Sequence, residues 1–213
     1  MFPPFPNYNL HQVHQQQNYH PAYYQPITGG MSAALLASIT APEKPSVLLQ
    51  AVVTLGEKTA AGHILKAVAP AWAEIIRLME EDPYFLFKID PRKLEEMIAG
   101  AYDRAGFDEV ILTPRSGDLG RDVIASRKDW GRVRFIDQVK AYKPKHLVTA
   151  EEVRALGFVL MSDQNATKGI VTTTSDFAPK IAEDPLIKPH MPYRIELVNG
   201  TELVRRLSEL AKG

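Results

Sequence analysis

The chain has 213 residues, a mass of 23.8 kDa, and 25 basic and 25 acidic residues. Its length predicts one domain with an appendage, and its 45% hydrophobic content predicts a sizeable globular core. The balanced charge gives no argument for a nucleic-acid binder on net charge alone. The absence of cysteine excludes disulfide scaffolds, thiolate zinc sites and cysteine nucleophiles, and it fits a reducing, cytoplasmic compartment. No apolar run approaches the ~18 residues of a membrane span, so no membrane partner is expected.

The N-terminal part of the chain lacks charged residues. No Asp, Glu, Lys or Arg precedes Glu43, and residues 1–30 contain five Pro, five Gln and four Tyr. A segment of this composition buries too little surface to offset its ordering entropy. We therefore expect residues 1–45 to be a disordered, low-complexity leader, and the sequence leaves open whether residues 1–30 are native.

A helical pattern follows the leader between Ser46 and Glu81. Its apolar residues recur at steps of three and four, at Ile64, Val68, Trp72, Ile75, Ile76 and Met79. Pro70 is expected to kink this segment or to divide it in two. We interpret residues 46–87 as a helical extension that forms a packed helix pair or a dimerisation surface, with residues 58–80 as the candidate homodimer contact.

From about Lys88 the chain alternates helical and strand patterns. Asp90 and Pro91 open an apolar helical stripe that ends at Gly106, and Thr149 with Glu152 forms a capping box for a second helix. Strand-like runs lie at residues 109–113, 121–126, 132–140, 169–173 and 194–198. The pattern further predicts a short helix over 175–183, a turn at 199–200 and a last helix from residue 201. These elements predict an α/β domain over residues 88–213, with a mixed central sheet flanked by helices.

Four polar residues lie at positions in these predicted elements where they could form a functional site. Glu95 lies about 90° from the centre of its helical stripe and can reach over the sheet. Asp122 opens an apolar run, where an unpaired carboxylate is costly and needs a metal, a lysine or a turn amide. Gln138 and Lys140 share one face of a strand, while Val139 points to the other face. Taken singly, Glu95 and the pair of Gln138 and Lys140 are also explained by an ordinary solvated surface.

In this order the residues resemble the Mrr-like branch of the PD-(D/E)xK nucleases, also described as type IV restriction endonuclease-like, in which glutamine often replaces the second acid. The resemblance runs from about Lys88 to the C-terminus. It rests on the segments 94–98, 105–107, 113–118, 120–125, 138–140 and 168–177. Leu119 departs from the family pattern, which usually has glycine at that place.

The resemblance implies a restriction-endonuclease-like core and a divalent metal, usually Mg²⁺ with Mn²⁺ as a substitute. It implies that Asp122 binds the metal, that Glu95 supports it directly or through water, and that Gln138 and the carbonyl of Val139 complete the protein ligands. Lys140 would orient or deprotonate the attacking water and stabilise the charged phosphorane-like state. Hard oxygen ligands suit Mg²⁺. The two carboxylates balance one such ion, so we expect one tightly held metal per site.

Basic residues gather around this constellation. Residues 115–145 contain nine basic and four acidic residues, so the charge is locally positive although the total is zero. The candidate nucleic-acid contacts are Arg115, Arg121, Lys143, Lys145, Thr172, Thr173 and Ser175. A solvated hairpin surface is the alternative explanation for the nearby Arg127, Lys128, Arg132 and Arg134, and a strand-end cap is the alternative for Thr172, Thr173 and Ser175.

The sequence therefore predicts a metal-dependent endonuclease that hydrolyses DNA phosphodiester bonds in restriction or antiphage defence. The resemblance further implies a homodimer or higher homo-oligomer, and we expect a separate specificity or activator partner, or a short extension, to choose the target. The alternatives are a catalytically silent nucleic-acid-binding module, and a nuclease that acts on RNA or in DNA repair. Sequence and methylation specificity are not defined by these motifs.

Overall fold

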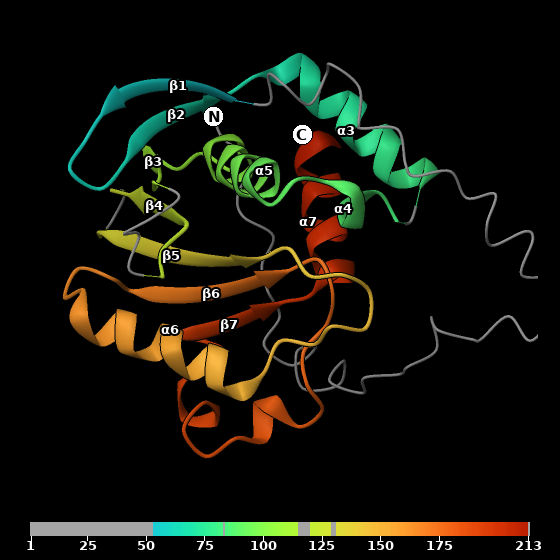
Figure 1. Cartoon of the computed structure of the whole chain (residues 1–213). Helices are drawn as coiled ribbons and strands as arrows, with labels where there is room; N and C mark the ends of the chain where they lie inside the picture. Colours follow the sequence, from blue (N-terminus) through green and yellow to red (C-terminus); the bar gives the residue numbers. More distant parts are fainter. Residues whose placement is uncertain (1–52, 83, 115–119, 129–130, 213) are drawn as a thin grey trace, which may run out of the picture. The chain divides into compact units, whose positions relative to one another are not determined.

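A single β-sheet frames the structure. The computed structural model describes residues 53–82, 84–114, 120–128 and 131–212, which fall within one compact unit spanning residues 42–213. In this described part, seven strands form one sheet in sequence order (Figure 1). The strands are β1 Val53–Lys58, β2 His63–Ala67, β3 Glu109–Leu112, β4 Val123–Arg127, β5 Val133–Lys140, β6 Lys168–Thr173 and β7 Ile195–Val198.

The sheet is mixed, and β5 is the strand where its direction changes. From β1 to β5 neighbouring strands pair antiparallel, whereas β5, β6 and β7 pair parallel. Val123 of β4 lies opposite Asp137 of β5, and Gln138 lies opposite Val171 of β6. The predicted fold class, a mixed sheet flanked by helices, is confirmed.

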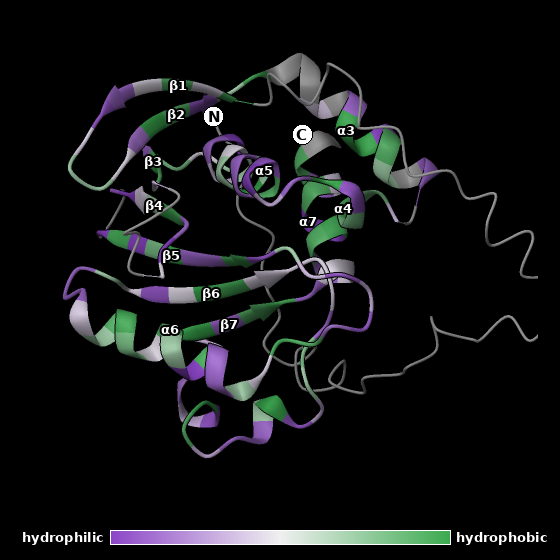
Figure 2. Cartoon of the chain, viewed as in Figure 1, coloured by the Kyte–Doolittle hydropathy of each residue, from purple (hydrophilic) through white to green (hydrophobic). Residues whose placement is uncertain are grey.

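Helices cover both faces of the sheet (Figure 1). The helices are α3 Ala69–Glu81, α4 Phe85–Lys88, α5 Pro91–Arg104, α6 Ala150–Ser162 and α7 Gly200–Lys212. Residues of α3, α5 and α7 share one buried cluster with Phe135 and Val139 of β5, while residues of α6 share a second cluster with Ile136. Apolar residues run along the central strands and the helices that cover them (Figure 2). None of the described helices combines the length and hydropathy needed to cross a membrane.

Local signals set the ends of α5 and α6 as predicted. The side chain of Asp90 accepts the N–H of Arg92 at 2.9 Å, and Pro91 takes the first helical position. The helix ends just before Gly106, whose φ of +84° suits glycine. Thr149 and Glu152 form a reciprocal capping box at the start of α6. These boundaries follow from side chains that lie close in sequence, which is why the sequence predicts them.

Two predictions near the C-terminus are wrong. The predicted helix over 175–183 is reduced to a short 3₁₀ turn, Ile181–Glu183. The predicted turn at Asn199-Gly200 is instead the start of α7, because Asn199 Oδ1 accepts the N–H of Glu202 at 3.0 Å. An Asn-Gly pair permits a turn, but the side chain of Asn199 caps a helix equally well.

The sequence predicted helix over residues 53–67, and this prediction is wrong. Residues 46–52, like the predicted leader, lie outside the described part of the chain. β1 and β2 form a hairpin, and β2 pairs with β3. Gly62 allows this pairing, because a Cβ there would lie 2.2 Å from the carbonyl oxygen of Leu112. The partner strand lies more than 40 residues further along the chain, so the spacing of apolar residues around Ile64 does not reveal it.

α3 is helical as predicted, but its apolar face is not a free dimerisation surface. Trp72, Ile75, Ile76 and Met79 are buried in the same cluster as residues of α5 and α7. β1, β2 and α3 therefore share sheet and core with the predicted nuclease domain. A homodimer contact would need other side chains than these four.

Gly100 marks a close approach between α5 and its neighbours. A Cβ at Gly100 would lie 2.9 Å from the ring of Trp72 and 3.1 Å from Cγ1 of Val53. We expect Gly100→Ala to lower the free energy of unfolding by about 1–3 kcal/mol, because overpacking outweighs the helix-propensity gain of about 1 kcal/mol. Urea denaturation measures the change.

Gly157 of α6 supplies the matched control for this substitution. A Cβ at Gly157 would meet no atom within 4 Å. Gly157→Ala is therefore expected to raise the free energy of unfolding by about 0.5–1 kcal/mol. Equal stabilisation by both alanines would show that Gly100 is not sterically required.

Candidate active site

Asp122 is fixed by the main chain at the start of β4. Its N–H donates to the carbonyl oxygen of Asp137 at 3.1 Å, and its carbonyl oxygen accepts the N–H of Thr113 at 3.1 Å. Its Oδ2 accepts the N–H of Val139 at 2.6 Å. Because Val123 pairs with Asp137, Asp122 lies across the strand pair from Gln138. The half-buried carboxylate is thus held beside β5 by a backbone amide of that strand.

Gln138 supplies an unsatisfied acceptor near this carboxylate. Its Oε1 is buried and has no hydrogen-bond partner among the described residues. Gly120, with φ of +75°, packs over the amide, since a Cβ there would lie 3.2 Å from Nε2 of Gln138. Leaving a buried acceptor unpaired costs about 1–3 kcal/mol, and a bound cation would remove that cost.

Lys140 shares a face of β5 with Gln138 and is held by α6. Its Nζ lies 3.9 Å from Oε1 of Glu152, which also accepts the hydroxyl of Tyr142 and caps α6 with Thr149. Burial alone would raise the pKa of Glu152, but the hydrogen bonds from Thr149 and Tyr142 and the charge of Lys140 together hold it below its usual value. A charged Glu152 therefore restrains the ammonium group of Lys140 at the end of β5.

Glu95 lies on α5, where its described ion pair is with Arg92 at 2.7 Å. Tyr102, seven residues later, lies on the same helical face, about 20° away. The hydroxyl of Tyr102 donates to Oδ2 of Asp137 at 2.8 Å, so this face of α5 packs on β5.

The direction of α5 places Glu95 toward the end of the sheet that carries Asp122. Asp103, near the end of α5, accepts the N–H of Ala67 at the end of β2. β2 and β5 run in opposite directions, so the end of β2 and the start of β5 lie at one end of the sheet. The N-terminal half of α5 extends toward the other end. The structure thus brings Asp122, Gln138, Val139 and Lys140 together, and pairs Glu95 with Arg92.

The donor set fits a hard cation held mainly by oxygen and water. Within the described ranges, no group of three or more His, Cys, Asp and Glu side chains could hold a metal ion. The carboxylate of Asp122 and the donor-free Oε1 of Gln138 offer one charged and one neutral oxygen. Mg²⁺ is commonly bound through one or two carboxylates while it keeps several waters. These residues therefore suit Mg²⁺ better than a closed zinc site.

Comparison with family models finds one that matches residues 86–207, Mrr_cat, described as a restriction endonuclease. The match covers more than half of the chain and includes Glu95, Asp122, Gln138 and Lys140. The chain belongs to the Mrr restriction endonuclease family. The family predicted from the sequence is thereby confirmed.

Two solved structures are similar to this Mrr chain. "MspJI Restriction Endonuclease in Complex with 27-mer Oligonucleotide" is 20% identical, with a TM-score of 0.43, and the match covers 66% of this chain and 32% of that one. "DNA modification-dependent restriction endonuclease AspBHI" is 20% identical, with a TM-score of 0.39, and the match covers 66% and 35%. The Mrr chain thus matches about a third of the length of each protein. Comparison with curated proteins finds no match.

The sequence prediction missed Asp137, a buried acid in the strand that carries Gln138 and Lys140 of the Mrr site. Asp137 is 2% exposed. Its Oδ2 accepts the hydroxyls of Tyr102 at 2.8 Å and Thr172 at 3.0 Å. Burial raises its pKa to about 7, with a contribution from the charge of Asp122, although these hydrogen bonds lower it. A charged residue inside the apolar run of β5 was the available signal, because the same argument singled out Asp122.

Three of the predicted nucleic-acid contacts of the Mrr domain have exposed or partly exposed side chains. Lys143 and Lys145 are exposed in the loop after β5, three and five residues beyond the end of that strand at Lys140. Arg121 is partly exposed, with Nη1 3.6 Å from Oδ2 of Asp163. Arg115 lies outside the described residues.

The hydroxyl residues have internal partners instead. Thr172 and Thr173 are buried, and their hydroxyls donate to Oδ2 of Asp137 and to the carbonyl oxygen of Lys140. The N–H of Ser175, a half-buried residue, donates to the hydroxyl of Thr173. This placement gives the two threonines a role in joining β5 to β6, and it uses their hydroxyl protons within the fold.

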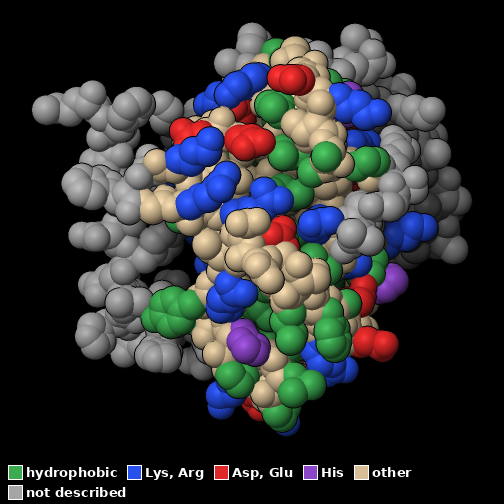
Figure 3. Space-filling model, turned by 90° about the vertical axis from the view of Figure 1, so that its left-hand side faces the viewer, with side chains coloured by type: hydrophobic (Ala, Val, Ile, Leu, Met, Phe, Trp, Pro, Cys, Tyr) green, Lys and Arg blue, Asp and Glu red, His purple; other side chains and the backbone are tan. Residues whose placement is uncertain are grey.

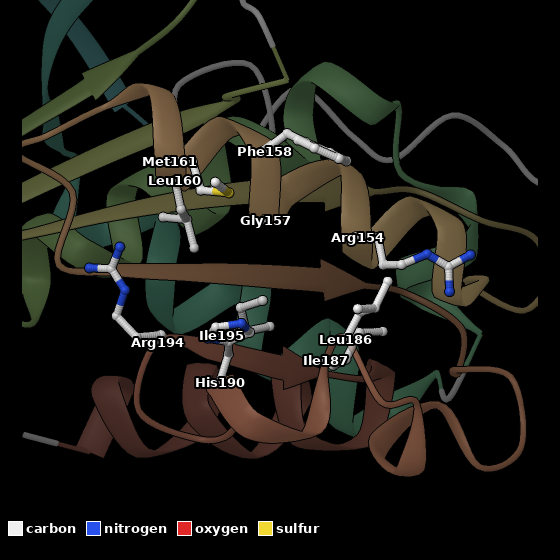
Figure 4. A pocket seen from close by; sticks show the side chains of 10 residues that line it. All are labelled: Arg154, Gly157, Phe158, Leu160, Met161, Leu186, Ile187, His190, Arg194 and Ile195. Atoms are coloured by element: carbon white, nitrogen blue, oxygen red, sulfur yellow. The ribbon is translucent and has the colours of Figure 1, made fainter.

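A separate pocket of about 260 Å³ lies between α6 and residues 186–195. Side chains of both segments face it across the gap (Figure 4). Phe158, Met161 and Leu186 at this pocket are strongly exposed, and hydrophobic side chains gather in the lower part of the face shown in Figure 3, with Lys, Arg and His beside them. None of the described candidate site residues lines this pocket, so the proposed chemistry of the Mrr domain lies elsewhere.

Proposed function

We propose that this chain is a Mg²⁺-dependent endonuclease that hydrolyses DNA phosphodiester bonds, with Mn²⁺ as a substitute ion, in restriction or antiphage defence. The observation that carries this proposal is the buried, donor-free Oε1 of Gln138 across the strand pair from the carboxylate of Asp122. Membership of a restriction endonuclease family supports DNA as the substrate.

The proposed metal ligands are Asp122, Oε1 of Gln138 and the carbonyl of Val139, with Glu95 acting through water. When bound, the ion supplies positive charge at the scissile phosphate and lowers the pKa of a water. The hydrogen bond from the Val139 N–H holds the carboxylate of Asp122 against β5. Because both strands contribute, the ligand set depends on the register between β4 and β5.

Lys140 is the proposed group that meets the reacting phosphate. It lies on the same face of β5 as Gln138, two residues further along. Glu152 keeps its ammonium group at the end of the strand, ready to donate to a phosphate oxygen or to orient the attacking water. Fixed positive charge at this place stabilises the extra negative charge that develops as the P–O bond breaks.

Lys143 and Lys145 are the proposed backbone-positioning contacts, together with Arg121. Both lysines are exposed in the loop that follows Lys140. Charges of this kind hold the DNA phosphates in a salt-dependent manner and carry no sequence information. Target choice therefore belongs to a separate specificity or activator partner, and a homodimer or higher homo-oligomer would supply a second site for the second strand.

The test is cleavage of plasmid and single-stranded DNA with Mg²⁺, Mn²⁺ or EDTA. Asp122→Asn keeps an oxygen that accepts the Val139 N–H but removes the charge, so we expect it to lower the cleavage rate by about 10²–10³-fold. Asp108→Asn is the matched control, because Asp108 accepts the N–H of Lys128 at 2.7 Å near the opposite end of β4. This variant is expected to cleave at the wild-type rate.

The other outcomes separate the alternative functions. DNA binding without cleavage under every metal condition would support the catalytically silent binding module. Faster cleavage of RNA than of DNA would support an RNA nuclease. Cleavage that survives EDTA, or an Asp122→Asn variant as active as the wild type, would contradict the proposal.

A further inference from the structure

Two buried polar side chains and one partly buried tyrosine join three elements on the face of β5 that points away from Gln138 and Lys140. They are Tyr102 of α5, Asp137 of β5 and Thr172 of β6, here called the Asp137 cluster. Both hydroxyls donate to Oδ2 of Asp137, at 2.8 and 3.0 Å. Phe135 and Val139, two residues to either side of Asp137, pack into the apolar cluster with α5, so the carboxyl group lies in an otherwise apolar layer.

Stability alone does not account for this cluster. A buried carboxyl costs desolvation energy, and apolar side chains of similar volume are often as stable or more stable in such places. Oδ1 of Asp137 has no hydrogen-bond partner among the described residues, which adds to the cost. The carboxyl group does provide directional bonds, and these fix how α5 and β6 sit against β5 in a way that apolar contacts do not.

The cluster connects with each residue proposed to hold the metal. The carbonyl oxygen of Asp137 accepts the N–H of Asp122, and Gln138 is its neighbour in the chain. Glu95 lies on the same face of α5 as Tyr102, two helical turns away. A shift of β5 against α5 would therefore move Asp122 and Gln138 relative to Glu95.

We propose that the Asp137 cluster positions the metal-holding residues, by locking β5 to α5 and β6 directly behind the site. Asp137, Tyr102 and Thr172 are in this sense positioning residues, because they act through the backbone of β5 and touch neither metal nor DNA. The inference rests on the proposed function, since it concerns the same metal site.

The test compares hydroxyl deletions at the two ends of the β5–β6 pair. Tyr102→Phe and Thr172→Val each remove one donor to Asp137, and Thr172→Ser keeps the hydroxyl. Thr167→Val is the matched control, because the Thr167 hydroxyl joins the same two strands at their other end, through the N–H and the carbonyl oxygen of Arg134 at 2.9 Å each. Binding of Mn²⁺ to each full-length variant is followed by the paramagnetic resonance signal of the free ion, alongside urea unfolding and Mg²⁺-dependent cleavage.

We expect Tyr102→Phe and Thr172→Val to weaken Mn²⁺ binding by about 10–100-fold, while Thr172→Ser and Thr167→Val bind as the wild type does. Wild-type Mn²⁺ affinity in both deletion variants, with Asp122→Asn defective, would overturn the positioning role and leave the proposed function standing. Equal weakening by Thr167→Val and Thr172→Val would also overturn it, because general destabilisation would then explain both. A wild-type protein that neither binds Mn²⁺ nor cleaves DNA would overturn both proposals.

Discussion

Lys140→Met is expected to lower the turnover number for DNA cleavage by about 10²–10³-fold, with little change in DNA affinity. Methionine has a similar length and fills the space along β5, so the fold is retained. Gln138 is neutral, so the substitution removes the positive charge that this pair of side chains presents on its face of β5. Glu152, which lies 3.9 Å from Lys140, keeps its bonds to Thr149 and Tyr142 in the variant. Single-turnover cleavage at saturating protein separates the chemical step from binding.

Lys143→Met is the control that distinguishes a loss of DNA binding from a loss of catalysis. Lys143 is exposed in the loop after β5, so its loss is expected to weaken DNA binding at all sequences and to reduce the salt dependence of binding by about one charge. Its single-turnover rate at saturating protein is expected to match that of the wild type. If Lys140→Met instead weakened binding and spared the rate, Lys140 would be a backbone contact and not a catalytic residue.

The stability of the metal-free protein is expected to fall as the pH rises from about 4 to about 7. The carboxyl of Asp137 has a pKa of about 7 in the folded state because it is buried, against ~3.9 in an unfolded chain. Between these values the folded state binds a proton that the unfolded state has released. The contribution is therefore fully present below pH ~4 and is lost as the pH rises through 7, with a maximal slope of about 1.4 kcal/mol per pH unit and a total of about 4 kcal/mol.

Asp137→Asn isolates this contribution from other titrating groups. Asn offers an oxygen to Tyr102 and Thr172 but carries no proton to lose, and the charges that face it, Asp122 and Arg206, stay in place. Urea denaturation in EDTA at several pH values between 4 and 7.5 gives the difference between wild type and variant. We expect the wild type to lose stability relative to Asp137→Asn as the pH rises. A difference that is constant, or that changes in the opposite direction, would show that Asp137 does not titrate in this range.

Local chemistry determined which parts of the fold were predictable from the sequence. The first residues of α5 and α6 are set by the N-cap Asp90 and by the capping box of Thr149 with Glu152. The hydrogen-bond partners of these caps lie within three residues along the chain. The strands that carry Asp122 and Gln138 were predicted because apolar runs define them. The β1–β2 hairpin was missed because β2 gains its stability from pairing with β3, far along the chain.

In the candidate site, too, contacts between neighbouring strands were predictable, whereas contacts between distant segments were not. Asp122 and Gln138 are brought together by neighbouring strands of one antiparallel pair, so their proximity follows from the predicted strands. The Asp137 cluster joins residues that are 35 positions apart on either side of Asp137, and no short motif encodes such a contact. The role of Thr172 and Thr173 stayed open in the sequence, because threonine suits a buried strand and a phosphate contact equally well.

Binding of one divalent cation by Asp122 and Gln138 is measured by calorimetric titration of the full chain with Mg²⁺ and with Mn²⁺. We expect one binding event per chain, which is lost in Asp122→Asn and retained in Asp108→Asn. Two comparably tight sites per chain, or binding that is unchanged in Asp122→Asn, would contradict it.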